Sequence, residues 1–256
     1  MEKGRSTKDW RPHGWVRVRM RVSVATDTGK VRQRNEDSYV VDTVRGLFAV
    51  CDGMGGHRGG DVASRLAVRS IHAWIKDNPP GSSITPLEGA IQHANRMVWE
   101  ESQKDAELKD MGTTATAALI WENRLFIGHV GDSALYLIRN QQIDKLTRDH
   151  TLAEQMVSKG LITGEESRNS AYNHILTRAI GIAPRVEIDS CQIPLAYGDV
   201  ILICSDGLSD LLTPQQMLEI YRQNPGDLDK IAEELVQTAL SRGGHDNITL
   251  ILLLID

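Results

Sequence analysis

The 256-residue sequence has few cysteines and no pairing pattern for them. Its three cysteines are an odd number, and no CxxC pair is present. Neither a disulfide framework nor a zinc knuckle fits such a set. Cys51 and Cys204 end apolar runs, and Cys191 lies in an alternating one. We expect all three to be buried free thiols in a reducing compartment.

Long apolar runs are also missing. No stretch approaches the roughly 18 apolar residues that cross a bilayer, so no transmembrane segment is expected. Residues 1–22 carry seven Lys/Arg against Glu2 and Asp9, without the apolar core of a signal peptide. We therefore expect a cytoplasmic protein in which residues 1–14 form a flexible basic leader.

A strong positive charge is absent. The net charge is -5, and because the first 22 residues are basic, the remainder carries about -10. The composition thus gives no support for a nucleic-acid partner. Hydrophobic content of 41% and charged content of 25% are ordinary for a folded soluble protein. We expect one folded domain over residues 15–256, present as a monomer.

Several common enzyme motifs are missing too. The sequence has no GxxxxGK[ST] loop and no GxGxxG after a strand, so a nucleotide-phosphate cradle is not expected. It has no GxSxG and no HExxH, which argues against a hydrolase nucleophile elbow and a zincin site. The chemistry must come from another pattern.

Strand and helix patterns are both present, in separate blocks. Apolar residues at helical spacing predict helices at 62–76, 86–103 and 228–240, and a short one after Thr213. Alternating and continuous apolar runs predict strands. These are 16–22, 38–43, 47–51, 113–121, 124–130, 134–139, 186–193, 200–204 and 248–255.

The order of these elements favours an α+β fold. Strands come in hairpin-spaced groups and helices in two blocks, which suits antiparallel sheets flanked by helices. Thr85-Pro86-Leu87-Glu88 and Thr213-Pro214-Gln215-Gln216 each predict a capping box with proline at the first helical position. The segment 149–181 interrupts the strand blocks, and we expect a flap-like insertion there.

Acidic residues gather just beyond the ends of apolar runs. Leu47–Cys51 leads into Asp52-Gly53, and Val200–Cys204 leads into Ser205-Asp206-Gly207. One Asp-Gly is usually a turn, but a strand that is apolar throughout ends inside the protein. Other acidic residues adjoin further apolar runs, namely Glu36, Asp37, Asp132 and Asp246.

Carboxylates that meet in one partly buried place would protonate unless a cation neutralises them. The clusters offer oxygen ligands, without the paired His or Cys of zinc sites, so Mg²⁺ or Mn²⁺ is expected. Gly53 can add its backbone carbonyl at little steric cost. Structural calcium is the alternative, although no DxDxDG loop is present.

This ligand chemistry suits phosphoester hydrolysis. Paired hard ions about 4 Å apart activate water and clamp the oxygens of an in-line displacement. Uncatalysed monoester hydrolysis needs acceleration on the order of 10²¹-fold, and one acid or base supplies only roughly 10² to 10⁴. Arg32, close in sequence to Glu36 and Asp37, can add a bidentate phosphate donor. A solvated surface arginine is the alternative.

The acidic clusters belong to a longer ordered set of motifs. They are Arg32–Ser38, Cys51–His57, Met111–Thr114, Val130–Ser133, Thr147–Thr151, Ile175–Gly181, Ser205–Asp210 and His245–Asn247. In this order, from about Ser23 to Ile255, the set resembles the metal-dependent serine/threonine protein phosphatases of type 2C, in their compact bacterial form.

The resemblance implies an α-β-β-α sandwich of two antiparallel β-sheets flanked by helices, with a metal centre at one end. It also implies hydrolysis of phosphoserine and phosphothreonine in proteins by a metal-bridging hydroxide, without a phosphoenzyme. Phosphorylated proteins are then the substrates. A serine/threonine kinase is the expected partner whose action the enzyme reverses.

The resemblance further implies roles for single residues. Asp52 is expected to be catalytic and to bridge two Mg²⁺ or Mn²⁺ ions, with Asp206 and Asp246 on the first ion and the Gly53 carbonyl on the second. Two more ligands, attached directly or through metal-bound waters, are Glu36 and Asp37.

Other motif positions are expected to assist this centre. Asp132 and Asp210 resemble ligands of a weaker third metal, and Arg32 resembles the phosphate clamp. Asn247 and Thr114 are expected to support the ligands from behind.

Two departures from the family pattern affect substrate chemistry. Met54 stands where animal members carry a histidine proposed as general acid, so that role falls to a metal-bound water or to His57. Ala134 replaces the arginine of many relatives and leaves open any substrate contact made there. The flap is expected to shape access and substrate choice.

Two rival functions differ in class. A pseudophosphatase that binds without turnover would lack one of Asp52, Asp206 or Asp246, and all three are present. A two-metal phosphodiesterase or nuclease would predict a basic groove, which the acidic body of the chain does not suggest.

Overall fold

A computed structural model of the chain describes residues 18–55, 59–79, 83–168 and 170–256. The expected basic leader at 1–14 lies outside the described residues, and so does His57.

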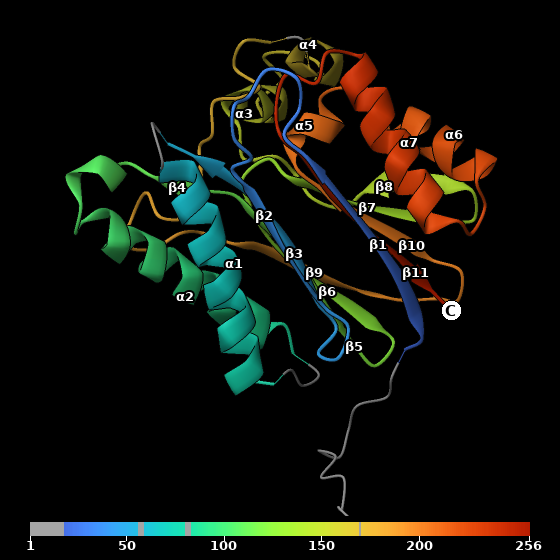
Figure 1. Cartoon of the computed structure of the whole chain (residues 1–256), viewed down its shortest axis with the longest axis horizontal. Helices are drawn as coiled ribbons and strands as arrows, with labels where there is room; N and C mark the ends of the chain where they lie inside the picture. Colours follow the sequence, from blue (N-terminus) through green and yellow to red (C-terminus); the bar gives the residue numbers. More distant parts are fainter. Residues whose placement is uncertain (1–17, 56–58, 80–82, 169) are drawn as a thin grey trace, which may run out of the picture.

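Two antiparallel sheets form the centre of the fold (Figure 1). The first sheet has, in spatial order, β1 (Met20–Asp27), β11 (Ile248–Ile255), β10 (Val200–Cys204), β7 (Ala134–Arg139) and β8 (Gln142–Lys145). The second has β2 (Asp37–Asp42), β3 (Leu47–Met54), β5 (Ala115–Trp121), β6 (Arg124–Val130) and β9 (Asp189–Pro194), with β4 (Gly112–Thr113) paired to β3.

Helices cover the outer face of each sheet (Figure 1). The second sheet packs against α1 (Gly59–Asp77) and α2 (Thr85–Ser102), and the first against α6 (Pro214–Gln223) and α7 (Leu228–Ser241). The shorter helices are η1 (Ala106–Leu108), α3 (Leu152–Ser158), α4 (Gly164–Arg168) and α5 (Asp206–Ser209). The α-β-β-α sandwich expected from the sequence is confirmed.

Alternation along the central strands creates three apolar layers. In β11, Leu252 faces the helices α6 and α7, whereas Leu253 faces the other sheet. Successive side chains of a strand point to opposite faces, and both faces are covered here. This is why β3, β10 and β11 have continuous apolar runs rather than alternating ones.

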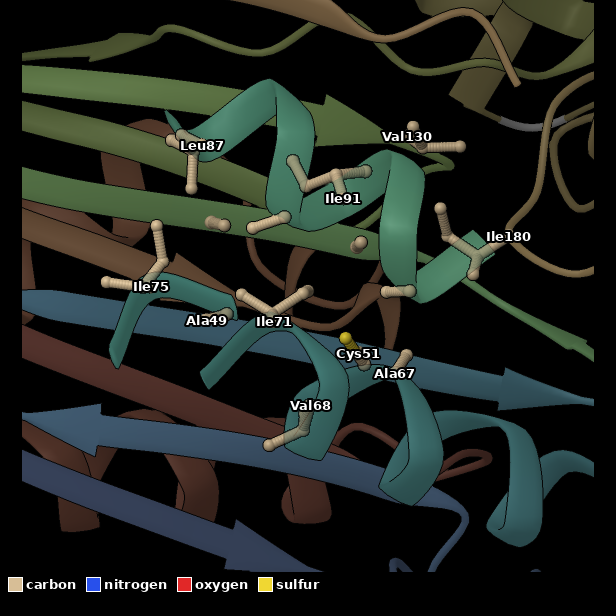
Figure 2. Close-up of a cluster of buried hydrophobic side chains, with 14 of the residues drawn as sticks. Ala49, Cys51, Ala67, Val68, Ile71, Ile75, Leu87, Ile91, Val130 and Ile180 are labelled. Atoms are coloured by element: carbon tan, nitrogen blue, oxygen red, sulfur yellow. The ribbon is translucent and has the colours of Figure 1, made fainter. Parts of the chain in front are cut away.

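The layer between α1, α2 and the second sheet combines large helix residues with small strand residues. Figure 2 shows Ile71 and Ile75 of α1 and Ile91 of α2 next to Ala49 and Cys51 of β3. All five side chains are at most 1% exposed. The small strand residues let both helices lie close to the sheet, which anchors β3 and the motif at its end.

Two sequence expectations about local structure are wrong. Thr85 does not cap α2, because Ile84 takes the N-cap position without a side-chain bond, and Glu88 accepts a hydrogen bond from Ser190 instead. Thr213 does form the predicted capping box. Cys191 is exposed rather than buried, since it lies on the edge strand β9, while Cys51 and Cys204 are buried free thiols.

Element boundaries differ in several places. The strand predicted at 16–22 is observed as β1 over Met20–Asp27, and residues 16 and 17 lie outside the described part of the chain. The strand predicted at 186–193 begins only at Asp189, and β8 had no predicted counterpart. In the flap-like segment 149–181, the described residues form the short helices α3 and α4 and take part in two isolated β-bridges, Thr151–Leu176 and Thr113–Ile180. Among the described residues, no helix is both long and apolar enough to span a membrane.

Candidate metal centre

Antiparallel pairing brings the acidic motifs of the second sheet together. β3 carries Asp52 near its end, and β2 begins at Asp37 beside it, so the two aspartates are register partners. Glu36 precedes β2 directly. The end of one strand and the start of its neighbour therefore deliver three carboxylates to one edge.

The first sheet delivers its acidic motifs to the same edge. Cys204, the last residue of β10, pairs with Ala134 at the start of β7 and with Leu250 near the start of β11. Asp206 lies two residues beyond the end of β10, and the turns before β7 and β11 supply two more acidic residues. These are Asp132 and Asp246.

A pocket of about 620 Å³ opens at this edge. The predicted site residues that line it are Arg32, Glu36, Asp52, Gly53, Thr114, Asp132, Asp206, Asp210, Asp246 and Asn247. The remaining predicted ligand, Asp37, lies behind the lining, where its Oδ2 accepts a hydrogen bond from Ser205 Oγ at 2.8 Å. The structure thus gathers residues far apart in sequence, such as Arg32 and Asp246, which are 214 positions apart.

Thr114 fixes the backbone of Asp52. Its hydroxyl accepts from the Asp52 amide at 2.9 Å, and its amide donates to the Asp52 carbonyl at 2.8 Å. Thr113 Oγ1 donates to the same carbonyl at 2.7 Å. The backbone groups of Asp52 are therefore held by β4 and its neighbour, and the carboxylate faces the pocket.

Asn247 fastens the loop that carries Arg32 and Glu36. Its Oδ1 accepts from the Glu36 amide at 2.8 Å, and its Nδ2 donates to the carbonyls of Thr28 and Arg34, both at 2.9 Å. The Asn247 amide donates to the side chain of the neighbouring Asp246. One side chain thus joins the turn before β11 to the segment before β2.

Glycines allow the backbone segments around the pocket to approach closely. A Cβ on Gly53 would lie 2.2 Å from the Gly60 carbonyl oxygen, and one on Gly207 would lie 2.0 Å from the Asn247 carbonyl oxygen. No larger residue fits at either position without a backbone shift. Gly53 is one of the predicted ligands, through its backbone.

Arg32 lies at the rim of the pocket. Its Nη2 is 2.6 Å from Asp246 Oδ2, and its side chain is 53% exposed. The hydrogen bond with Asp246 raises the pKa of Arg32, so the guanidinium stays charged. The Arg32 guanidinium therefore lies beside the carboxylates and remains accessible from solvent.

Several carboxyl groups at this site have raised pKa values. Burial raises the pKa of Asp52 and of Asp132 well above the ordinary value, and the charges of nearby aspartates raise both further. Burial also raises the pKa of Asp37 and of Asp210 to about 7. The pKa of Asp206 is raised by burial and then by the charge of Asp246.

The site therefore suits divalent cations. Asp37 Oδ1 and Asp206 Oδ1 are buried and have no hydrogen-bond partner within the described part of the chain. Buried polar atoms are normally satisfied, and clustered carboxylates repel one another unless a cation lies among them. Hard ions with oxygen ligands fit this donor set.

The structure adds one candidate ligand that sequence reasoning missed. His174, from the flap, lines the pocket, and its Nδ1 is 3.4 Å from Asp210 Oδ2. Ligand atoms of His174, Asp206 and Asp210 all lie within 4.8 Å of one another. A single histidine in an irregular segment offers no periodic or motif signal, so sequence reasoning had no means of finding it.

The two departures from the family pattern have clear locations. Met54 lines the pocket and carries no proton to donate. Ala134 is fully buried on the face of β7 that packs against the outer helices, so its side chain makes no substrate contact.

Comparison with known proteins gives one consistent result. The sequence matches the family described as Protein phosphatase 2C over residues 28–249. The serine/threonine phosphatase stp of Listeria monocytogenes serotype 4b is 37% identical over 240 residues, covering 91% of this chain and 95% of that protein.

Solved structures are similar over nearly the whole chain. Serine/threonine phosphatase Stp1 from Staphylococcus aureus has a TM-score of 0.87 at 31% identity, covering 96% of this chain and 99% of that one. The catalytic domain of PstP in complex with two manganese ions has a TM-score of 0.83 at 35% identity, covering 91% and 97%. The full PstP of Mycobacterium tuberculosis is longer, and this chain matches 45% of its length.

Proposed function

Since this chain belongs to the protein phosphatase 2C family and is a metal-dependent serine/threonine protein phosphatase, we propose that the pocket at the sandwich edge is its catalytic centre. The convergence of Asp52, Asp206 and Asp246 from three strand ends carries this proposal. The manganese ions of the similar PstP catalytic domain support it.

Two Mg²⁺ or Mn²⁺ ions would be held at the inner wall of the pocket. Asp52 would bridge them, with Asp206 and Asp246 on one ion and the Gly53 carbonyl on the other. Glu36 and Asp37 complete the set, directly or through water, and the buried unpaired oxygen of Asp37 supports its place there. When bound, such ions lower the pKa of water and neutralise phosphoryl oxygens.

The chain's own residues then orient the substrate. Arg32 is the phosphate clamp, because its planar guanidinium can donate two parallel hydrogen bonds to phosphoryl oxygens. Its contact with Asp246 holds it beside the ligand cluster. Thr114 and Asn247 keep Asp52 and Asp246 in place through the backbone hydrogen bonds described above.

A third ion would bind nearer the flap, between Asp132 and Asp210. His174 joins this set, because its ring nitrogen lies close to Asp210.

Phosphorylated proteins are the substrates, and a serine/threonine kinase supplies them. The acidic pocket gives no groove for a nucleic-acid backbone, which needs basic residues. The three free cysteines suit a reducing, cytoplasmic setting. We propose that the domain acts as a monomer over residues 15–256, with 149–181 as its flap.

The test is phosphate release from a phosphothreonine peptide by metal-stripped protein to which Mn²⁺ is returned. We expect release that requires Mn²⁺ and stops with EDTA. Binding of the peptide without release would indicate a pseudophosphatase, and hydrolysis of a bis-ester in preference to the peptide would indicate a phosphodiesterase. Either result would overturn the proposed function.

A further inference from the structure

The two ends of the flap are tied together at its base. The Thr177 amide donates to the His150 carbonyl at 2.7 Å, and the Leu152 amide donates to the Ile175 carbonyl at 2.9 Å. Thr151 and Leu176 form an antiparallel bridge between these two bonds. Residues 150–152 and 175–177 therefore form a short paired stem, which we call the flap stem.

His150 joins the flap stem to the turn that carries Asp132. Its backbone amide donates to the Gly131 carbonyl at 2.8 Å, and its Nδ1 accepts from the Gly131 amide at 3.1 Å. Both polar backbone groups of Gly131 are thus bound by one residue. The His150 side chain is 5% exposed, so water competes little for these bonds.

Gly131 also lies against Thr114, the residue that holds the backbone of Asp52. It has a φ of +107°, and a Cβ there would lie 2.5 Å from Thr114 Cγ2. Thr114 in turn holds the backbone of Asp52. A continuous set of contacts therefore runs from the flap stem through Gly131 to Asp52, with Asp132 next to it.

The other ring nitrogen of His150 points away from the pocket. Nε2 lies 3.2 Å from both Asp189 Oδ2 and Arg178 Nη1, and Arg178 Nη1 donates to Asp189 Oδ1 at the shorter distance of 2.6 Å. Because Nδ1 accepts a hydrogen bond, the proton of the neutral ring is on Nε2, where it is donated to Asp189. Burial lowers the pKa of His150, which agrees with a neutral ring.

We infer that His150 is a positioning residue that fixes the flap stem and the Gly131-Asp132 turn relative to each other. The flap residues His174 and Leu176 then face the ligand cluster in one fixed arrangement. The inference rests on the proposed function for its kinetic consequence. Its structural content, a coupling between the two segments, stands independently of that function.

Three variants separate this role from simple core packing. His150→Phe keeps a ring but removes both nitrogens. His150→Asn keeps an oxygen that can accept from the Gly131 amide. His93→Phe is the matched control, because His93 lies on α2 and outside the pocket lining.

Amide hydrogen exchange, measured peptide by peptide, is the primary readout. For His150→Phe we expect exchange to speed up by about 10-fold or more at both 131–133 and 150–152, with α1, α2 and α7 unchanged. His150→Asn should restore most of the protection at 131–133. Faster exchange throughout the chain, or in the flap alone, would overturn the inference.

Kinetics provide the second readout. The kcat/KM of His150→Phe for a phosphothreonine peptide should fall by about 10- to 100-fold, as for other residues that orient metal ligands, with partial rescue in His150→Asn. His93→Phe should match the unaltered protein, and equal kinetics for His150→Phe would refute the inference. If the unaltered protein releases no phosphate, the proposed function fails while hydrogen exchange still decides the coupling.

If His150→Phe does not fold, Asp189→Ala replaces it. Asp189 is half-exposed, and its loss removes the carboxylate beside Nε2 and one Arg178 contact, while Arg178 keeps its contact with Glu187. Faster exchange at both 131–133 and 150–152 in that variant supports the inference, and unchanged exchange at 131–133 contradicts it.

Discussion

The sandwich edge and the flap contribute to the same pocket in different ways. At the edge, Asp52 lies near the end of β3 and Asp206 lies just beyond β10, two strands with continuous buried runs, and hydrogen bonds from Thr114 fix the backbone of Asp52. The flap has two short helices, and side chains such as Leu161 and Tyr172 are 66% and 46% exposed. The chemistry is thus built on rigid elements, whereas access depends on a segment held mainly at its stem.

The largest effect should come from breaking the edge. Asp206→Asn removes one proposed ligand and one buried charge. We expect activity on a phosphopeptide to fall more than about 100-fold, because even residues behind metal ligands cost about 10- to 100-fold when changed.

The same substitution should make the metal-free protein more stable, since burial and Asp246 both disfavour the ionised Asp206. Urea unfolding without metal measures this change. Lower stability of the metal-free variant would contradict the repulsion on which the metal site is inferred.

A smaller loss should follow from loosening the support behind Asp52. Thr114→Val keeps the shape of the side chain but removes the acceptor for the Asp52 amide and the bond to Ser133. We expect Mn²⁺ affinity or phosphatase activity to fall by about 10- to 100-fold. Calorimetry measures the Mn²⁺ affinity, and peptide hydrolysis measures the activity. Unaltered Mn²⁺ affinity together with unaltered activity would show that Thr114 does not position Asp52.

Stability should separate the two regions further. Leu253→Ala, in the layer between the sheets, should lower the free energy of unfolding by about 2–5 kcal/mol. The matched flap variant, Leu161→Ala, should change it by less than about 0.5 kcal/mol, because Leu161 is exposed. Urea denaturation tests both, and equal effects would mean that the flap shares the core's cooperativity.

The pH dependence should be the most gradual effect. Asp37 and Asp210 have a pKa of about 7 in the fold, against about 4 when unfolded. Without metal, their contribution to stability is fully present below about pH 4 and is lost as pH rises through about 7.

Divalent ions favour the ionised carboxylates, so stabilisation by Mn²⁺ should grow between about pH 5 and about pH 8. Urea unfolding with and without Mn²⁺ at both pH values measures it. A stabilisation that shrinks with rising pH would contradict the assigned titration.

The difference between the regions also explains what the sequence could predict. The strands β6, β7, β10 and β11 were predicted to the residue, because buried strands leave continuous or alternating apolar runs. The acidic residues next to these apolar runs allowed the residues of the site to be predicted. The convergence of these acidic residues depends on the antiparallel register of the strands, for example the pairing of Asp37 with Asp52. The resemblance carried by the ordered motifs implied this convergence.

The wrong or missing predictions concern features that depend on tertiary contacts. Thr85 matches a capping box, but Glu88 bonds to Ser190 on β9 and the helix starts after Ile84. The exposure of Cys191 depends on β9 being an edge strand. His174 reaches the pocket only because the stem folds the flap back over it, and no local pattern encodes that.

The most direct test is a crystal structure of the protein with Mn²⁺, using anomalous scattering to locate the ions. We predict at least two manganese peaks in the pocket, one of them between Asp52 and Asp206. Manganese bound elsewhere, or a pocket without manganese at saturating concentration, would contradict the claim that these carboxylates converge to hold metal.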